Sequence, residues 1–159
     1  MTKKLVAYFS PTGTTEQVAK KLAEAIQADV FEIQPVEKYS TADLDWSDKQ
    51  SRSTKEIHDK SFRPAIAKKV ENMEQHDILY VGFPIWWLIA PTIINTFLED
   101  YDLSGKTIVP FATSGGSGMG RTNQGLLPSC DGAKLLFGKV LQAGASVEDL
   151  RTWANEVEK

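Results

Sequence analysis

Hydroxyl side chains and one glycine cluster in a short segment, Ser10-Pro11-Thr12-Gly13-Thr14-Thr15, that directly follows an apolar run. A turn from a strand into a helix points free backbone N–H groups at one spot, at the positive end of the helix dipole. Gly13 allows the backbone to approach an anion closely. We therefore interpret the segment as a phosphate-binding loop. The alternative is an ordinary helix N-cap, because threonine is common at that position.

The chemistry of this loop favours a monophosphate. It contains no lysine or arginine, and N–H and O–H donors alone can meet the charge of one terminal phosphate. A triphosphate with Mg²⁺ would call for the Walker lysine, and the sequence has no G-x-x-x-x-G-K-[ST] motif. The donors we assign to the phosphate are Ser10, Thr12, Gly13, Thr14 and Thr15.

Two other loops have unusual chemistry. One is apolar and aromatic, Pro84-Ile85-Trp86-Trp87-Leu88-Ile89-Ala90-Pro91, although a loop is normally polar unless something covers it. The other is rich in glycine, Thr113-Ser114-Gly115-Gly116-Ser117-Gly118-Met119-Gly120, and offers N–H groups to a polar ring edge. The alternatives are tryptophans that belong to the core and a glycine loop that binds nothing.

Apolar runs before each of these loops predict the strands that position them. The runs 5–9, 78–83 and 107–113 are nearly continuous, as expected for strands covered on both faces. A weaker run at 30–33 suits an edge strand, and 135–140 is a fifth candidate. Pro110 lies inside the third run, where it removes one ladder donor.

Helical patterns alternate with these runs, which predicts a doubly wound α/β fold with a parallel sheet. Apolar residues recur at helical spacing in three places, and Pro91 and the pair Ser146 and Asp149 are typical of helix starts. The expected buried stripes are Val18, Leu22 and Ile26; Ile93, Ile94, Phe97, Leu98 and Tyr101; and Leu150, Trp153, Ala154 and Val157.

The polar segment 35–64 interrupts this alternation. A bare linker of that length is unusual inside a compact domain, so we expect a partly helical excursion. Its apolar residues Leu44, Trp46, Ile57 and Phe62 are expected to anchor it on the sheet.

In a parallel sheet of order 2-1-3-4-5, ligands lie beyond the carboxyl ends of the strands, at the switch point between strands 1 and 3. The three loops leave strands 1, 3 and 4 at this edge. A ligand with a phosphate tail and a planar heteroaromatic head satisfies all of them, and FMN fits that description. The residues expected to face the ring are Pro84, Ile85, Trp86, Trp87, Thr113, Ser114, Gly115 and Gly116, with Ser117, Gly118 and Arg121 as weaker candidates. For Arg121, solvated surface is the favoured alternative.

Composition limits the classes of function. The 159 residues predict a single domain, 1–159, and the net charge of −3 argues against a partner with a phosphate backbone. The sequence has no apolar run of membrane-spanning length. The lone Cys130 excludes an intrachain disulfide and a cysteine-rich metal site, so we expect a cytoplasmic protein with no resident metal. We expect Cys130 to be buried and inert, and His58 and His76 to have surface or capping roles.

These motifs resemble those of the flavodoxins, and most closely the short bacterial flavodoxin-like proteins. The segment 8–15 resembles the family's T/S-x-T-G-x-T phosphate loop directly after strand 1. The segments 82–87 and 112–118 resemble the two flavin-facing loops of that subgroup, and 39–46 resembles its excursion. The resemblance implies a flavodoxin-like three-layer sandwich with a five-stranded parallel sheet of order 2-1-3-4-5, the cofactor FMN, and electron transfer. Well-studied flavodoxins are strongly acidic, often with an acid-rich loop after strand 4, whereas this loop is rich in glycine and serine.

Two functional hypotheses follow. The first is an electron carrier that serves a redox partner protein, and the second is an NAD(P)H-dependent reductase of quinones or other small acceptors; either fits a monomer or a homodimer. Receiver domains share the topology, but they need acidic residues after strand 1 and an aspartate at the end of strand 3, where this chain has Ser10 and Pro84. A G-x-G-x-x-G run after strand 1 and a G-x-S-x-G elbow are both absent.

Overall fold

A parallel sheet forms the centre of the computed structural model, which describes residues 3–114 and 118–158. Its strands are β1 (Lys4–Tyr8), β2 (Asp29–Glu32), β3 (Ile78–Pro84), β4 (Thr107–Thr113), β5 (Lys134–Leu135) and β6 (Lys139–Val140). Their order is β2-β1-β3-β4-β5, with β6 also paired to β4, and every pairing is parallel. This confirms the predicted α/β fold and the 2-1-3-4-5 order.

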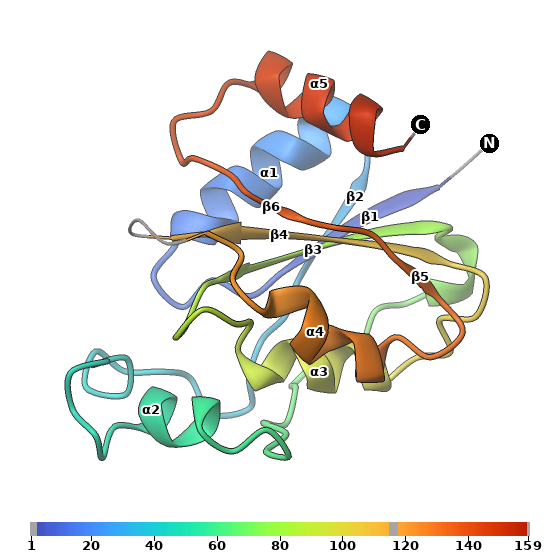
Figure 1. Ribbon diagram of the computed structural model, residues 1–159. Coiled ribbons are helices and arrows are strands. Elements are labelled where there is room, and N and C mark those ends of the chain that lie inside the picture. Colours follow the sequence, from blue (N-terminus) through green and yellow to red (C-terminus); the bar gives the residue numbers. More distant parts are fainter. Residues whose placement is uncertain (1–2, 115–117, 159) are drawn as a thin grey trace.

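Helices cover both faces of the sheet (Figure 1). Helices α1 (Thr14–Ile26) and α5 (Val147–Val157) lie on one face, and α3 (Thr92–Glu99) and α4 (Thr122–Leu126) lie on the other. The short helix α2 (Arg52–Ile57) lies to one side of these layers, and two 3₁₀ turns, η1 (Met73–Gln75) and η2 (Leu127–Ser129), complete the elements. Each face has its own hydrophobic cluster, so the sheet is buried on both sides, as its nearly continuous apolar strands predict.

Pro110 explains why two short strands share the fifth position of the sheet. The carbonyls of Ile108 and Ala112 face this side and accept hydrogen bonds from Leu136 and Leu141. Pro110 lies between them on the same side, and it has no N–H to offer to the neighbouring strand. The ladder therefore stops after β5 and resumes at β6, with one extra residue on the outer strand.

The predicted helical stripes are largely confirmed. Ile93, Ile94, Phe97 and Leu98 are buried, as are Val18, Leu22, Leu150 and Ala154. Ile26, Trp153, Val157 and Tyr101 are partly buried, and Tyr101 lies beyond the end of α3. The side chain of Ser146 accepts a hydrogen bond from the Asp149 amide, which confirms the predicted cap of the last helix.

The excursion 35–64 contains α2, as expected, but its anchors differ in part from the prediction. Ile57 is buried, whereas Trp46 is 76% exposed and Phe62 is 41% exposed, so their predicted anchoring is wrong. Arg52 holds the excursion together internally, because it binds Glu56 and the Glu37 carbonyl. Tyr39, whose ring contacts Phe9 and Trp86, and Arg63, which pairs with Glu99, connect the excursion to the rest of the domain. A pattern of apolar residues in the sequence does not predict polar contacts of this kind.

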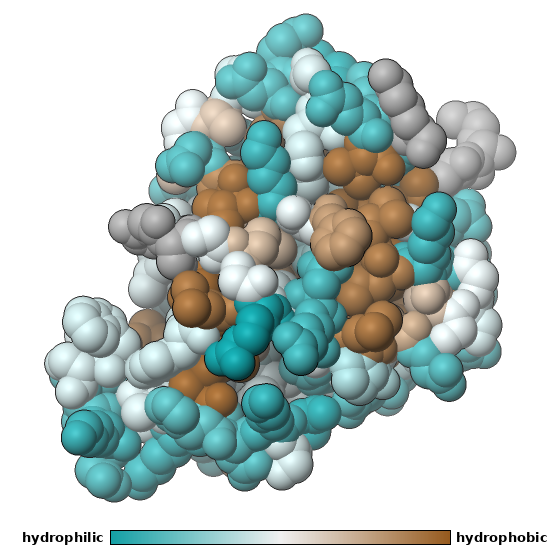
Figure 2. Space-filling view, in the orientation of Figure 1, coloured by the Kyte–Doolittle hydropathy of each residue, from teal (hydrophilic) through white to brown (hydrophobic). Residues whose placement is uncertain are grey.

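Apolar side chains gather on the surface near the outer edge of the sheet, over β5, β6 and α4 (Figure 2). Phe137, between β5 and β6, is 88% exposed. Among residues 3–114 and 118–158, no helix is long and apolar enough to cross a lipid bilayer.

Alkaline pH is expected to destabilise the fold through Tyr80. Burial, followed by the hydrogen bond from its hydroxyl to Glu158, raises the pKa of Tyr80 well above its usual value. The folded protein keeps this proton while the unfolded chain releases it, so the free energy of unfolding falls as pH rises above about 10. The free energy of unfolding, measured with urea at several pH values above 10, should fall less steeply with pH for Tyr80→Phe than for wild type. The difference between the two slopes should be about 1.4 kcal/mol per pH unit. Equal slopes would contradict this prediction.

Candidate functional site

The three loops expected to bind the ligand meet at the carboxyl edge of the sheet. The Thr15 and Thr113 hydroxyls are 2.7 Å apart, which connects the first loop to the end of β4. The Ile85 amide donates to the Thr113 carbonyl at 2.9 Å, and the Arg121 amide donates to the Leu88 carbonyl at 2.8 Å. The structure thus brings together residues from 10–15, 84–91 and 113–121 at one place, as the sequence predicts.

The loop after β1 turns sharply into α1 at Gly13. Its φ of 93° lies in the left-handed region, which glycine adopts without strain, and its carbonyl accepts the first helical hydrogen bond, from Gln17. The Ser10 hydroxyl accepts a hydrogen bond from the Glu16 amide at 2.9 Å. Ser10 therefore caps the helix, as in the N-cap alternative but with a serine, and its role in binding a phosphate stays a prediction. The side chains of Thr12 and Thr14 are exposed.

Four consecutive amides, of residues 12–15, remain available at this turn. Within the described part of the chain, none of them donates a hydrogen bond, whereas the next amide is satisfied by Ser10. Together with the exposed hydroxyls of Thr12 and Thr14 they form a set of neutral donors at the positive end of a helix. This donor set fits a phosphate.

One cation approaches this loop from the excursion, although the loop itself has none. Lys38 lines a hollow of about 270 Å³ together with Ser10, Pro11 and Tyr39, and Phe9 forms part of its wall. The sequence analysis missed Lys38, because nothing in the sequence shows that residues 35–39 run beside the end of β1.

The aromatic loop contains a tight turn with an unfavourable backbone. Trp86 and Ile89 exchange hydrogen bonds in both directions, at 3.0 and 3.1 Å. The two residues between them, Trp87 and Leu88, have φ values of 50° and 66°. Positive φ at both central positions is the geometry of a type I′ turn, which normally takes asparagine or glycine. Backbone strain of this kind is concentrated at functional sites.

The two adjacent tryptophans have different surroundings. The Trp86 ring contacts Phe9 and Tyr39 edge to face, with centroids 5.9 and 5.6 Å apart, and it packs against the main core. The Trp87 ring contacts that of His58, with centroids 5.8 Å apart. The alternative that the tryptophans belong to the core therefore fits Trp86 better than it fits Trp87.

A buried ion pair in the excursion supports Trp86 indirectly. Glu56 accepts a short hydrogen bond from the Tyr39 hydroxyl and pairs with Arg52 Nε at 2.7 Å. Burial, and then the neighbouring Glu56, raises the pKa of Tyr39 well above its usual value, so its phenol stays protonated. The guanidinium of Arg52 also lies 3.8 Å above the Tyr39 ring. These residues hold the ring against which Trp86 packs.

The glycine-rich loop is anchored at both ends. Thr113 is buried at the end of β4, and Gly118 is exposed. Gly120 has a φ of 56°, and a Cβ there would lie 2.3 Å from the Leu88 carbonyl oxygen, so only glycine allows this loop to approach the aromatic turn so closely. Gly115, Gly116 and Ser117 lie outside the described residues, and their assignment stays a prediction, as does that of Ser114.

The other titratable residues named in the sequence analysis have surroundings that indicate structural roles. Cys130 is buried, and burial raises the pKa of its thiol to about 11, which leaves little reactive thiolate at neutral pH. His76 is buried and its Nε2 lies 2.9 Å from Asp29. His58 follows α2 as its C-cap and contacts Trp87, a neighbour that the sequence analysis did not assign to it.

Comparisons with known proteins agree with this geometry. Residues 3–157 match a family described as flavodoxin. A candidate flavoprotein from Bacteroides eggerthii is 44% identical, with a TM-score of 0.94 over 100% of this chain and 99% of the other. One from Bacteroides uniformis is 48% identical, with a TM-score of 0.91 over 97% and 98%. A flavoprotein from Lactobacillus acidophilus, solved in complex with FMN, is 19% identical, with a TM-score of 0.72 over the full length of both chains. A search of curated proteins found no match.

Proposed function

The chain belongs to the flavodoxin family, and on that basis we propose that it binds one FMN non-covalently and uses it to transfer electrons. The observation that carries this proposal is the set of four unpaired amides at residues 12–15, next to the aromatic and glycine-rich loops. The complex of the Lactobacillus acidophilus relative with FMN supports it.

The residues of this chain would bind and orient the cofactor, and the bound flavin supplies the redox chemistry. Amides and hydroxyls of residues 10–15 would hold the phosphate, and Lys38 would add a positive charge beside Ser10. The turn at Trp87 would cover one side of the ring, while residues 113–118 would offer backbone donors and acceptors to its polar edge. Tyr39 and Phe9 fix Trp86 beneath this turn, so that the loop needs little rearrangement on binding.

An NAD(P)H-dependent reductase of quinones or similar small acceptors is the second candidate. Two observations favour it over a carrier that docks through an acidic surface. The net charge is only −3, and Arg121 follows the glycine-rich loop where acidic residues are expected in strongly acidic flavodoxins. A partner protein that recognises carboxylates would find few of them there, whereas a small acceptor does not need them.

Absorption spectroscopy of the purified protein, before and after addition of free FMN, tests the cofactor. Flavin bands that stay with the protein through gel filtration support the proposal, and a protein that retains no flavin after saturation contradicts it. A reductive titration then gives the potentials. Rapid turnover of NADPH with a quinone would identify the reductase, whereas reduction only by a partner protein or dithionite would identify the carrier.

Truncating the two tryptophans should have unequal effects. We expect Trp87→Ala to weaken FMN binding about tenfold with little change in stability, because Trp87 lies at the tip of the turn and stacking contributes on the order of 1–2 kcal/mol. Trp86→Ala should instead lower the free energy of unfolding by about 3 kcal/mol, since it removes packing against Phe9 and Tyr39. Fluorescence titration with FMN and urea unfolding separate the two effects, and equal changes in both measurements would contradict the assignment.

A further inference from the structure

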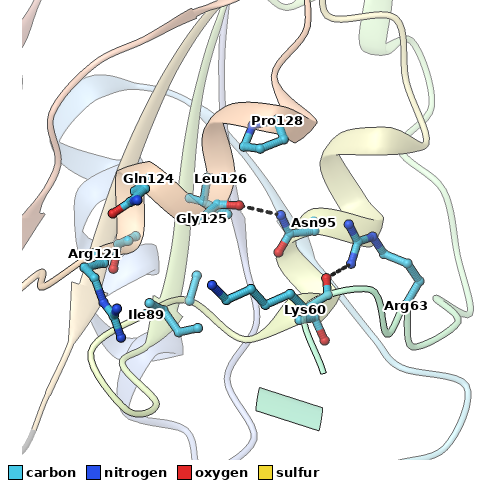
Figure 3. A pocket seen from close by; sticks show the side chains of 12 residues that line it. Lys60, Arg63, Ile89, Asn95, Arg121, Gln124, Gly125, Leu126 and Pro128 are labelled. Atoms are coloured by element: carbon cyan, nitrogen blue, oxygen red, sulfur yellow. Dashed lines mark hydrogen bonds between the residues drawn. The ribbon is translucent and has the colours of Figure 1, made fainter. Parts of the chain in front are cut away.

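A second pocket, of about 380 Å³, lies on the α3 and α4 face of the molecule, apart from the phosphate loop (Figure 3). The aromatic loop contributes Ile89 and Ala90, and the end of the excursion contributes Lys60 and Arg63. The rest of the wall comes from α3, α4 and the residues next to α4, which are Thr92, Asn95, Arg121, Thr122, Gln124, Gly125, Leu126 and Pro128.

The charged residues that line this pocket are all positive. None of its lining residues is acidic. Arg63 is neutralised by Glu99, with contacts of 2.8 and 3.0 Å. The side chains of Lys60 and Arg121 make no hydrogen bond or ion pair with the described part of the chain. Figure 3 shows the Lys60 side chain extending across the pocket toward the side where Arg121 lies. Two uncompensated cations therefore border one cavity.

A buried hydroxyl without a partner in the described structure belongs to a residue of the pocket wall. Thr92 is 5% exposed and lines the pocket, and its Oγ1 is a buried side-chain polar atom that lacks a hydrogen-bond partner in the described structure. Buried polar groups are almost always paired, because an unpaired hydroxyl costs free energy. Thr92 is also the first residue of α3, where the helix dipole is positive and the amides of Thr92 and Ile93 donate no hydrogen bond within the described structure, whereas that of Ile94 binds the Pro91 carbonyl. These features point to a ligand with anionic oxygens.

We propose that this pocket binds a small organic anion, whose carboxylate or phosphate group is held by Lys60, Arg121 and the first turn of α3 at Thr92. The body of the ligand would rest on the apolar wall of Ile89, Ala90 and Leu126. The Arg121 amide binds the Leu88 carbonyl, so the backbone that carries this cation is connected to the aromatic loop.

The pocket shares no residue with the phosphate loop at 10–15, so binding of an anion there can be measured without FMN. It does share the loop 84–91 with the proposed flavin site. An occupant of the pocket would lie beside that loop, where a small electron donor or acceptor with an anionic group could be held.

Amide NMR of the full chain tests the proposal, with and without FMN. The probes are benzoate, phenyl phosphate and, as an uncharged analogue of benzoate, benzamide. We expect saturable shifts of the Thr92 and Ile93 amides with an anionic probe and none with benzamide; comparison of the two anions identifies the preferred head group. The Gly13 and Thr14 amides report separately on the phosphate loop, so failure of the FMN proposal would be seen there and not at Thr92.

Substitutions of the pocket residues give a second test of the proposal. Lys60→Gln and Arg121→Gln should each weaken binding of the anionic probe about tenfold, whereas Lys55→Gln on α2, outside the pocket, should not. Thr92→Val should weaken binding about fivefold yet raise the urea midpoint of the unliganded protein, because a methyl group replaces an unpaired buried hydroxyl. Thr96→Val, one turn later on α3, is the matched control and should leave binding unchanged.

Absence of saturable shifts at Thr92 and Ile93 would overturn the proposal. Equal shifts with benzamide would also overturn it, as would variants of Lys60, Arg121 and Thr92 that bind the anion as tightly as their controls.

Discussion

Replacing Thr12 with aspartate is expected to abolish FMN binding while leaving the fold intact. The side chain of Thr12 is exposed, beside four amides that have no partner in the described structure, so the new carboxylate would project where the phosphate is to lie. Two like charges about 4 Å apart repel by about 4 kcal/mol at an effective dielectric constant near 20, which is about a thousandfold in affinity. The phosphate carries close to two charges, so this is a lower bound. An acidic side chain near the start of α1 interacts favourably with the helix dipole, so the substitution should not reduce the free energy of unfolding.

Thr12→Asn is the matched control, because it is nearly isosteric with the aspartate and carries no charge. Affinity is measured by quenching of flavin fluorescence on binding, and stability by urea unfolding without FMN. The asparagine variant should bind within about tenfold of wild type, since it loses at most one hydroxyl hydrogen bond. If Thr12→Asp bound FMN as tightly as Thr12→Asn, the phosphate could not lie at this turn.

The parts of the fold that follow local rules could be predicted from the sequence. Strands buried on both faces have continuous apolar runs, helices repeat their apolar residues every three or four positions, and Ser146 caps α5 through a contact three residues away. The meeting of three loops at one edge also follows from the sequence, because it needs only the strand order and the rule that parallel strands end on the same side.

Features that depend on distant contacts could not be predicted. Pro110 is an anomaly within a strand sequence, but its effect depends on which neighbouring strand its missing N–H faces. This is known only once the register with β5 and β6 is known. The positive φ values of Trp87 and Leu88 contradict local preference, and the Leu88 carbonyl is bound by the Arg121 amide of a distant loop. The pocket at Thr92 joins residues 60 and 121, which the sequence gives no reason to bring together.

The excursion 35–64 is the clearest example of contacts that the sequence does not predict, because polar side chains make many of them. Its apolar residues predict anchors, but Trp46 lies largely in solvent and Phe62 is 41% exposed. Within the segment, Arg52 pairs with the buried Glu56 and covers the ring of Tyr39. Through Tyr39 this cluster reaches Trp86 and the proposed flavin site. Stability of the excursion and affinity for FMN should therefore change together.

Arg52→Met is expected to lower the free energy of unfolding by about 3 kcal/mol, because it leaves the Glu56 carboxylate, whose side chain is 4% exposed, without its cation. FMN binding should weaken with it, as Tyr39 loses its support beneath Trp86. The double variant Arg52→Met/Glu56→Leu removes the unpaired charge as well and should regain most of the lost stability, since apolar groups can replace a buried ion pair at little cost. Urea unfolding of the single and double variants measures this recovery. A double variant as unstable as Arg52→Met would mean that the guanidinium acts through its contacts with Tyr39 and the Glu37 carbonyl, and not by neutralising Glu56.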